Sequence, residues 1–207
     1  ITAQQIDNGS TDNSTIANRS LDKTSFNCAN IGDNTVTLTV TDVNGNSATS
    51  TAVVTIKDTV IPTVITKDIT VDLDANGNAT ITAAQIDNGS TDNCSIDTIS
   101  ISKTSFDCSN IGENTIILTV VDVHGNSATK TALVTVKDTK LPTVVTQDIS
   151  VKLNANGNAT ITATEIDNGS SDNCAIATLT VTPNVFTTAN IGENIVVLTV
   201  TDVNGNV

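Results

Sequence analysis

Residues 35–42 read TVTLTVTD, a stretch in which apolar and polar side chains alternate. This period of two is typical of a β-strand with one buried face, so we expect Val36, Leu38 and Val40 to point into a core and Thr37 and Thr39 outward. The tight turn DVNGN follows at residues 42–46, and a second alternating segment comes after it. These residues predict two adjacent antiparallel strands.

The strand pair belongs to a unit that recurs every 80 residues without insertions. ITAQQIDNGSTDN at Ile1 returns as ITAAQIDNGSTDN at Ile81 and as ITATEIDNGSSDN at Ile161. Such copying favours a multiplied building block over an enzyme with one asymmetric site. We expect three β-sandwich repeats: residues 1–57 without their N-terminal part, a complete repeat at 58–137, and residues 138–207 without the last strand.

Composition supports an all-β chain and excludes several functions. Thr, Val and Ile favour strands, and Trp, Tyr and Met are absent. The net charge of -13 argues against binding to nucleic acid or anionic membranes. No stretch approaches the ~20 apolar residues of a membrane span. The three aromatic residues, Phe26, Phe106 and Phe186, share one repeat position and are predicted to fill the cores.

In the middle repeat we expect about seven short antiparallel strands, which make a β-sandwich. Ile69, Val71 and Leu73 share one face, and a hairpin turn at Asn76-Gly77 leads to a strand over residues 79–83. The proline-containing segments KDTVIP and KDTKLP, which begin at Lys57 and Lys137, are interpreted as linkers between repeats.

Recurring acids predict a metal site. In a sandwich of this type, the loop at 85–93 and the last hairpin turn meet beside the incoming linker, so their oxygen-bearing side chains would suit Ca²⁺. The alternative is that these residues only cap turns. A second motif, Asp72 to Gly77, resembles the opening of a calcium loop, but a plain turn is favoured because Lys152 replaces its first acid. The predicted metal ligands are Asp7, Asp12, Asp42, Asp58, Asp87, Asp92, Asp122, Asn126, Asp138, Asp167, Asp172 and Asp202.

Four cysteines occupy two repeat positions. If the Phe106 strand returns antiparallel to the strand before it, Cys94 lies opposite Cys108, and we predict a disulfide between them. Closing this short loop would contribute about 3 kcal/mol, and it would indicate an exported protein. Cys28 and Cys174 are then expected to be free thiols, since Ser14 and Thr188 occupy the partner positions in their repeats.

TDNC at residues 91–94 and NIGENTIILTVVDVHGNSATKTALVTVKDTKLP at 110–142 resemble the hyalin-repeat (HYR) family. The resemblance implies tandem immunoglobulin-like or fibronectin-III-like β-sandwiches, and similar Thr- and Asn-rich copies occur in giant surface adhesins of gliding, Bacteroidetes-type bacteria. Family members often carry a further cysteine where this chain has Lys130. The same resemblance makes Thr59 and Thr98 candidates for O-glycosylation.

No catalytic set is present in the sequence, so no enzyme is expected. His124, the one histidine, stands where the other copies have Asn44 and Asn204. We predict an extended stalk of a secreted cell-surface adhesin or filament, stiffened by calcium at the junctions and holding a distal binding region. Its partners would be neighbouring repeats, with other surface filaments or glycans as further candidates. Alternatives are repeats that bind polysaccharide or protein multivalently, and a spacer of a secreted hydrolase.

Overall fold

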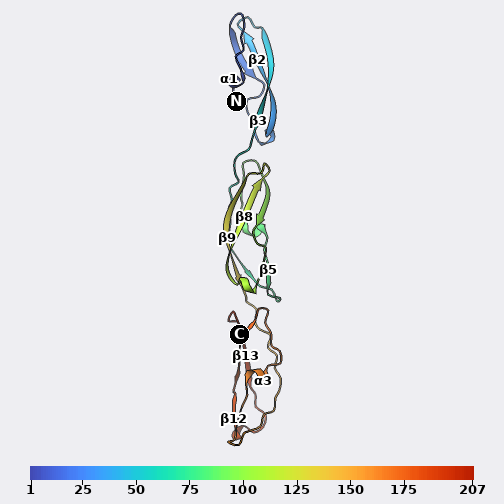
Figure 1. The fold of residues 1–207 in the computed structure, drawn as a ribbon, viewed down its shortest axis with the longest axis vertical. Coiled ribbons are helices and arrows are strands. Elements are labelled where there is room, and N and C mark those ends of the chain that lie inside the picture. Colours follow the sequence, from blue (N-terminus) through green and yellow to red (C-terminus); the bar gives the residue numbers. More distant parts are fainter. The chain divides into compact units, whose positions relative to one another are not determined.

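The computed structural model describes all 207 residues and shows an all-β protein whose helices are single turns (Figure 1). The predicted β-sandwich class is confirmed. Each α-helix has four residues. None of them has the length and apolar character that crossing a membrane would require.

The elements that the copies share follow one another in the same order, although residues 1–57 have no strand at the position of β7 and residues 138–207 none at that of β4. Residues 1–57 form α1 (Ala3–Ile6), β1 (Ile16–Leu21), the 3-10 helix η1 (Cys28–Asn30), β2 (Gly32–Asp42) and β3 (Ser47–Ile56). Residues 58–137 form β4 (Ile69–Asp72), β5 (Asn78–Thr80), α2 (Ala83–Ile86), β6 (Ile96–Ile101), β7 (Ser105–Asp107), η2 (Cys108–Asn110), β8 (Gly112–Asp122) and β9 (Ser127–Lys137). Residues 138–207 form β10 (Asn158–Thr160), α3 (Ala163–Ile166), β11 (Ile176–Thr182), β12 (Val185–Thr187), η3 (Thr188–Asn190) and β13 (Val197–Asp202).

The chain divides into two compact units. Unit 1 comprises Ile1–Val64, Ser90–Ile99 and Val120–Ala128, and unit 2 comprises Ile65–Gly89, Ser100–Thr119 and Thr129–Val207. These units do not coincide with the three repeats expected from the sequence, whose boundaries stay a prediction.

In unit 1, strands β1, β2 and β3 form one antiparallel sheet in that order. Val36 is fully buried and Leu38 is 6% exposed, as the alternation predicts. Val40 is half-buried, and so are Thr37 and Thr39. The turn after β2 is closed by a hydrogen bond from the Asp42 amide to the Asn46 carbonyl, 2.9 Å long.

The middle repeat differs from the prediction in its strand pairing. Its main sheet has the order β4-β9-β8-β6, and β4 runs parallel to β9, with Ile69 opposite Val134. Residues Asp74 and Asn78 do close a turn, with a 2.8 Å bond from the Asp74 amide. However, β5 then pairs with β7 in a second sheet. The turn therefore carries the chain from one sheet to the other, and the predicted β4-β5 hairpin is wrong.

The segment after β5 is also shorter than predicted, because Thr82 starts a helical turn. Its amide donates to Oε1 of Gln85 at 2.8 Å, which is part of a capping box. The strand consequently ends at Thr80, and α2 begins at Ala83. Ile86, at the end of α2, is fully buried, so this turn closes one edge of the core.

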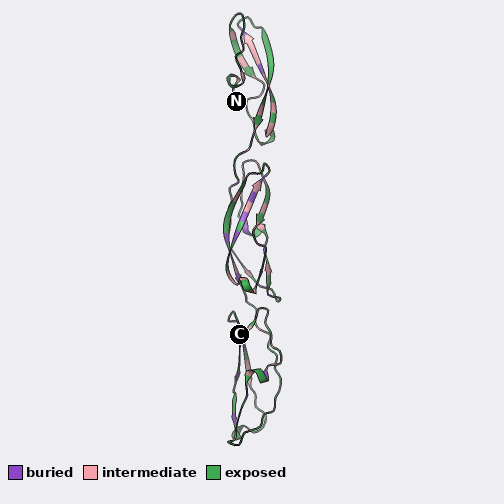
Figure 2. Cartoon of the chain, in the orientation of Figure 1, coloured by how far each residue is buried: buried purple, intermediate pink, exposed green.

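In residues 58–137 the buried side chains come from both sheets, Phe106 from β7 and Val134 from β9. In unit 2, Ile161, Ile166 and Phe186 pack with Val181, and Leu198 lies partly buried against them. Phe106 is 2% exposed and Phe186 8%, which confirms the predicted core position for these two, whereas Phe26 is only half-buried. In Figure 2 buried residues lie along the long strands β8 and β9 of the middle repeat. Other buried residues, such as Leu73 and Ile81, lie in the segments that connect the strands.

Candidate metal sites and the disulfides beside them

The D-x-x-G-N turn holds an aspartate in a fixed orientation. Oδ1 of Asp122 accepts 2.8 Å bonds from the amides of His124 and Asn126, and Oδ2 accepts a 2.7 Å bond from Nδ2 of Asn126. Burial raises the pKa of the Asp122 carboxyl, but these hydrogen bonds outweigh it, so the pKa lies below its ordinary value. Asp122 is 1% exposed and stays charged. The turns at Asp42 and Asp202 have the same bonds.

Two further carboxylates of unit 1 have one oxygen bonded and one without a partner. Oδ2 of Asp92 accepts a 2.8 Å bond from the Cys94 amide, while Oδ1 is buried and accepts no hydrogen bond. In the linker, Oδ1 of Asp58 accepts from the Val60 amide at 3.1 Å, while Oδ2 is buried without a hydrogen bond. Buried carboxylate oxygens are costly unless a donor or a cation compensates them.

The carboxylates meet in two clusters. We call Asp58, Asp92 and Asp122 the first cluster, and Asp138, Asp172 and Asp202 the second cluster. In each, one carboxylate oxygen from every residue lies within 4.8 Å of the others. The second cluster also has two buried oxygens that accept no hydrogen bond, Oδ2 of Asp138 and Oδ1 of Asp172. We call such atoms orphaned oxygens. Sequence reasoning predicted all six residues, and the structure brings them together.

The donor set of both clusters fits Ca²⁺. All three protein groups are carboxylates, the hard oxygen ligands that this ion prefers. The orphaned oxygens supply the physical test, since a cation would compensate them where no hydrogen-bond donor does. In the second cluster Oδ1 of Asn173, a neutral oxygen, is also buried without a partner. Asn173 occupies the same repeat position as Asn93, which the sequence predicted to supply a neutral oxygen beside the acids.

Other predicted ligands lie outside the clusters. Asp167 accepts bonds from the amides of Gly169 and Ser170, and these contacts cap its loop. Asp7 accepts from Ser10 and forms an ion pair with Arg19 at 2.7 Å. Oδ2 of Asp87 accepts from the amide of Gly89. For these three residues the turn-capping alternative describes the local structure.

Asn126 acts on the first cluster through its amide nitrogen. Nδ2 donates to Oδ2 of Asp122 and, at 3.4 Å, to the carbonyl oxygen of Asp58. It therefore ties the turn to the linker. In residues 1–57, Asp12 and Asp42 occupy the positions of Asp92 and Asp122 and line a pocket of about 400 Å³.

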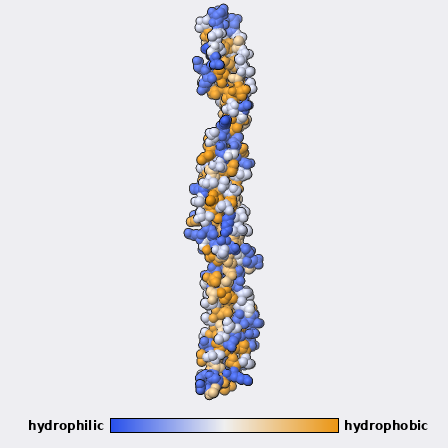
Figure 3. Space-filling model, viewed as in Figure 1, coloured by the Kyte–Doolittle hydropathy of each residue, from blue (hydrophilic) through white to orange (hydrophobic).

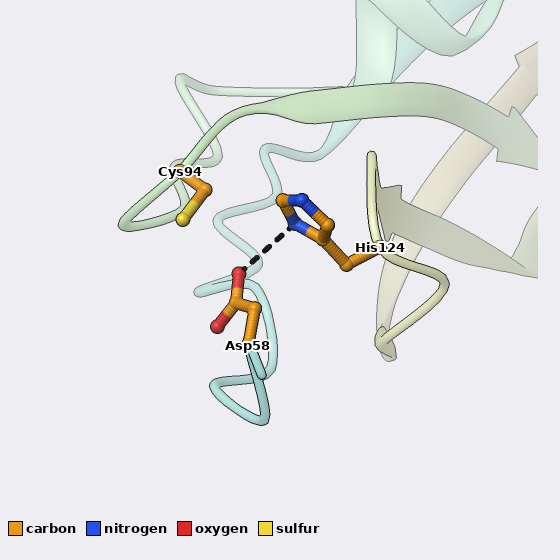
Figure 4. A group of neighbouring side chains, drawn as sticks. All are labelled: Asp58, Cys94 and His124. Atoms are coloured by element: carbon orange, nitrogen blue, oxygen red, sulfur yellow. Dashed lines mark ion pairs between the residues drawn. The ribbon is translucent and has the colours of Figure 1, made fainter. Parts of the chain in front are cut away.

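His124 distinguishes the first cluster from the second. Its Nδ1 lies 3.3 Å from Oδ2 of Asp58, and the Cys94 sulfur is within 4.8 Å of both side chains (Figure 4). Asp58 and His124 point toward each other, from the linker and the last turn. Asn204 stands at this position beside the second cluster. The first cluster thus has an imidazole nitrogen beside it, and the second cluster does not.

The predicted disulfide Cys94–Cys108 is wrong. Cys28 is bonded to Cys94 and Cys108 to Cys174, so the predicted free thiols Cys28 and Cys174 are both paired. We call these the first bridge and the second bridge. Each spans 66 residues and joins the 3-10 helix of one copy to the loop of the next.

The error came from the assumed direction of the β7 strand. Cys94 adjoins the C-terminal end of β8, where the Val123 amide donates to the Ser95 carbonyl at 3.1 Å. Cys108 belongs to η2, which directly precedes β8. The 11 residues of β8 separate the two cysteines by roughly 35 Å, far beyond the ~7 Å that a disulfide allows between Cα atoms. The signal in the sequence was that pairing across copies leaves no cysteine unpaired.

Exposed apolar side chains recur at equivalent positions of the repeat. Val43, Val123 and Val203 are 59%, 49% and 57% exposed at equivalent turn positions. On the face drawn in Figure 3, hydrophobic and hydrophilic residues are interspersed. Single exposed apolar side chains are ordinary on protein surfaces. Thr59 and Thr98, the glycosylation candidates, are both exposed.

Comparison with family models gave no match, and comparison with curated proteins gave none either. Among solved structures, extracellular cadherin domains 1–4 of protocadherin gamma B7 align with 82% of this chain at 11% identity and a TM-score of 0.35. The EC3-6 cis-dimer structure of protocadherin gammaB7 aligns with 94% of this chain at 14% identity and a TM-score of 0.34. The extracellular domain of protocadherin GammaB4 aligns with 94% of the chain at 19% identity and a TM-score of 0.34. The chain spans 54%, 64% and 38% of their respective lengths. A likeness at this level says nothing about the activity of the chain.

Proposed function

We propose that this chain is a structural stalk segment of a secreted cell-surface adhesin or filament, and that Ca²⁺ bound at the two clusters stiffens it. One observation carries the proposal. The same carboxylate cluster, with two buried oxygens that accept no hydrogen bond, recurs after 80 residues and adjoins a disulfide each time. A device copied with the repeat serves the array and not a single reaction centre.

Calcium would bind through oxygens that the fold has already oriented. In the first cluster these are Oδ2 of Asp58, Oδ1 of Asp92 and a carboxylate oxygen of Asp122. Asp58 belongs to the linker, whereas Asp92 and Asp122 belong to the sandwich that follows. An ion shared by all three would remove the repulsion among the carboxylates and fix the linker on its sandwich.

The disulfides support an exported location, because such bonds persist in oxidising compartments. The resemblance to hyalin-repeat arrays of bacterial surface proteins points the same way. A stalk needs no recognition surface on each unit, which agrees with the interspersed hydrophobic and hydrophilic residues of the face in Figure 3. Negative charge would keep neighbouring stalks apart and hydrated.

Titration of the whole chain with calcium in an isothermal calorimeter tests the proposal. We expect two binding events, of which Asp58→Asn and Asp138→Asn each remove one, while Asp97→Asn, an exposed acid outside the clusters, removes none. Small-angle scattering of the same samples should show a loss of mean end-to-end length when chelator is added. Binding that all three variants leave unchanged would refute the calcium sites, and a scattering profile that chelator does not alter would refute the stiffening role.

A further inference from the structure

The disulfides change which parts of the chain would carry a pulling force. A disulfide is a covalent shortcut, so tension applied at the chain ends passes through it, and the loop that it closes stays slack. Here the first bridge closes residues 28–94 and the second closes residues 108–174. Tension can therefore reach only Ile1–Cys28, Cys94–Cys108 and Cys174–Val207.

We propose that the two bridges form a continuous covalent path for tension that bypasses both linkers and the long strands of the core. In the middle repeat only β6 and β7 lie on this path. Strands β8 and β9, which hold most of its buried residues, lie inside the second loop. The linkers that begin at Asp58 and Asp138 also lie inside closed loops.

This role is distinct from that of calcium. The orphaned oxygens of Asp58 and Asp138 belong to linkers that bear no tension while the bridges are intact. An ion there would govern the bending of the chain, whereas the bridges would govern its greatest extension. The inference rests on the disulfide pairing and stands whether or not the clusters bind metal.

The length to which the bridged chain can be extended follows from the residue numbers of the cysteines. The three stretches under tension contain 27, 14 and 33 residue steps, out of 206 for the whole chain. At about 3.6 Å per extended residue, the bridged chain can reach roughly 270 Å, against roughly 740 Å without bridges. Each bridge thus hides about 240 Å of chain. The fully extended bridged chain is therefore about a third as long as the fully extended unbridged chain.

The second bridge is closely packed by the segments around it. The Cys108 sulfur lies 3.8 Å from the Gly77 carbonyl oxygen and 3.6 Å from that of Asn173. Nδ2 of Asn173 donates to the Asp74 carbonyl at 3.3 Å. Thus the turn at Asp74, the 3-10 helix η2 and the loop of the next copy meet around the bridge.

Single-molecule pulling of residues 1–207 by their ends tests the proposal. We expect a final contour length of about 270 Å under oxidising conditions and about 740 Å in a phosphine reductant. The double variant Cys28→Ser/Cys94→Ser should reach about 510 Å, and so should Cys108→Ser/Cys174→Ser. These lengths describe the fully extended chain, so they do not depend on how stable each variant is.

Three results would overturn the proposal: an oxidised chain that extends to about 740 Å, one that reaches about 690 Å because only Cys94–Cys108 is closed, or a length that reductant does not change. Chelator serves as the control. It should leave the final length of the oxidised chain at about 270 Å even if it lowers the forces of individual steps, and a longer chain in chelator alone would contradict the bypass.

Discussion

Gly77→Ala should damage the second bridge specifically. Gly77 has a φ of +74°, and a Cβ added there would lie 2.7 Å from the backbone oxygen of Asn173 and 2.8 Å from the Cys108 sulfur. Neither neighbour can move freely, because one is backbone and the other is bonded to Cys174. The turn and the loop of the next copy would therefore have to separate.

Gly125→Ala provides the matched control, since Gly125 has a φ of +88° and open space around the added Cβ. An alanine at positive φ costs about 1 kcal/mol at either position. Overlap with fixed neighbours adds about 2 kcal/mol at Gly77 alone. We expect Gly77→Ala to lower the melting temperature of its sandwich by roughly 10 °C more than Gly125→Ala does for the same domain size.

Calorimetry of both variants measures this difference, and thiol labelling of the unreduced proteins adds a second test. Gly77→Ala should leave a fraction of Cys108 and Cys174 unpaired while Cys28 and Cys94 remain bonded. Equal melting temperatures for the two variants, together with full bonding of all four cysteines, would refute the packing described around Gly77.

Three further predictions concern charged and metal-binding groups. Asp202→Asn should weaken calcium binding at the second cluster and leave the first unchanged, as measured by titration calorimetry. Hydrogen bonds from the amides of Asn78 and Asn76 hold the pKa of Asp74 below its ordinary 3.8. This carboxylate therefore stabilises the fold above about pH 4, and its contribution is lost as the pH falls through the lowered pKa. In Asp74→Asn the free energy of unfolding, measured by urea titration, should fall less steeply as the pH is lowered. His124→Asn removes the side chain that lies 3.3 Å from Oδ2 of Asp58, but the three carboxylates of the first cluster remain, so titration calorimetry should still show calcium binding there.

Local features of the fold could be predicted because they depend on residues close in sequence. Alternation at Val36 and Leu38 reports burial directly, and both are buried. The aspartate turns are also local, since Asp122 is held by amides two and four residues ahead. Predicting that Asp58 lies near Asp92 and Asp122 also required the fold class. In a β-sandwich the loops at one end lie close together.

The strand pairing and the disulfides could not be predicted in this way, because they depend on which distant strands become neighbours. Residues Asp74 to Asn78 form the same turn whether the next strand pairs in the same sheet or crosses to the other. Cys94 and Cys108 are close in sequence, yet β8 holds them apart. Pairing across copies leaves no cysteine unpaired, and the two separations are equal because both cysteine positions recur after 80 residues.

A disulfide map of the unreduced protein tests the central claim, that successive copies are covalently joined, most directly. Cleavage after lysine and arginine places the four cysteines in separate peptides, 24–57, 68–103, 104–130 and 153–207. Mass spectrometry should find 24–57 linked to 68–103 and 104–130 linked to 153–207. A link between 68–103 and 104–130, with the other two peptides carrying free thiols, would contradict the account.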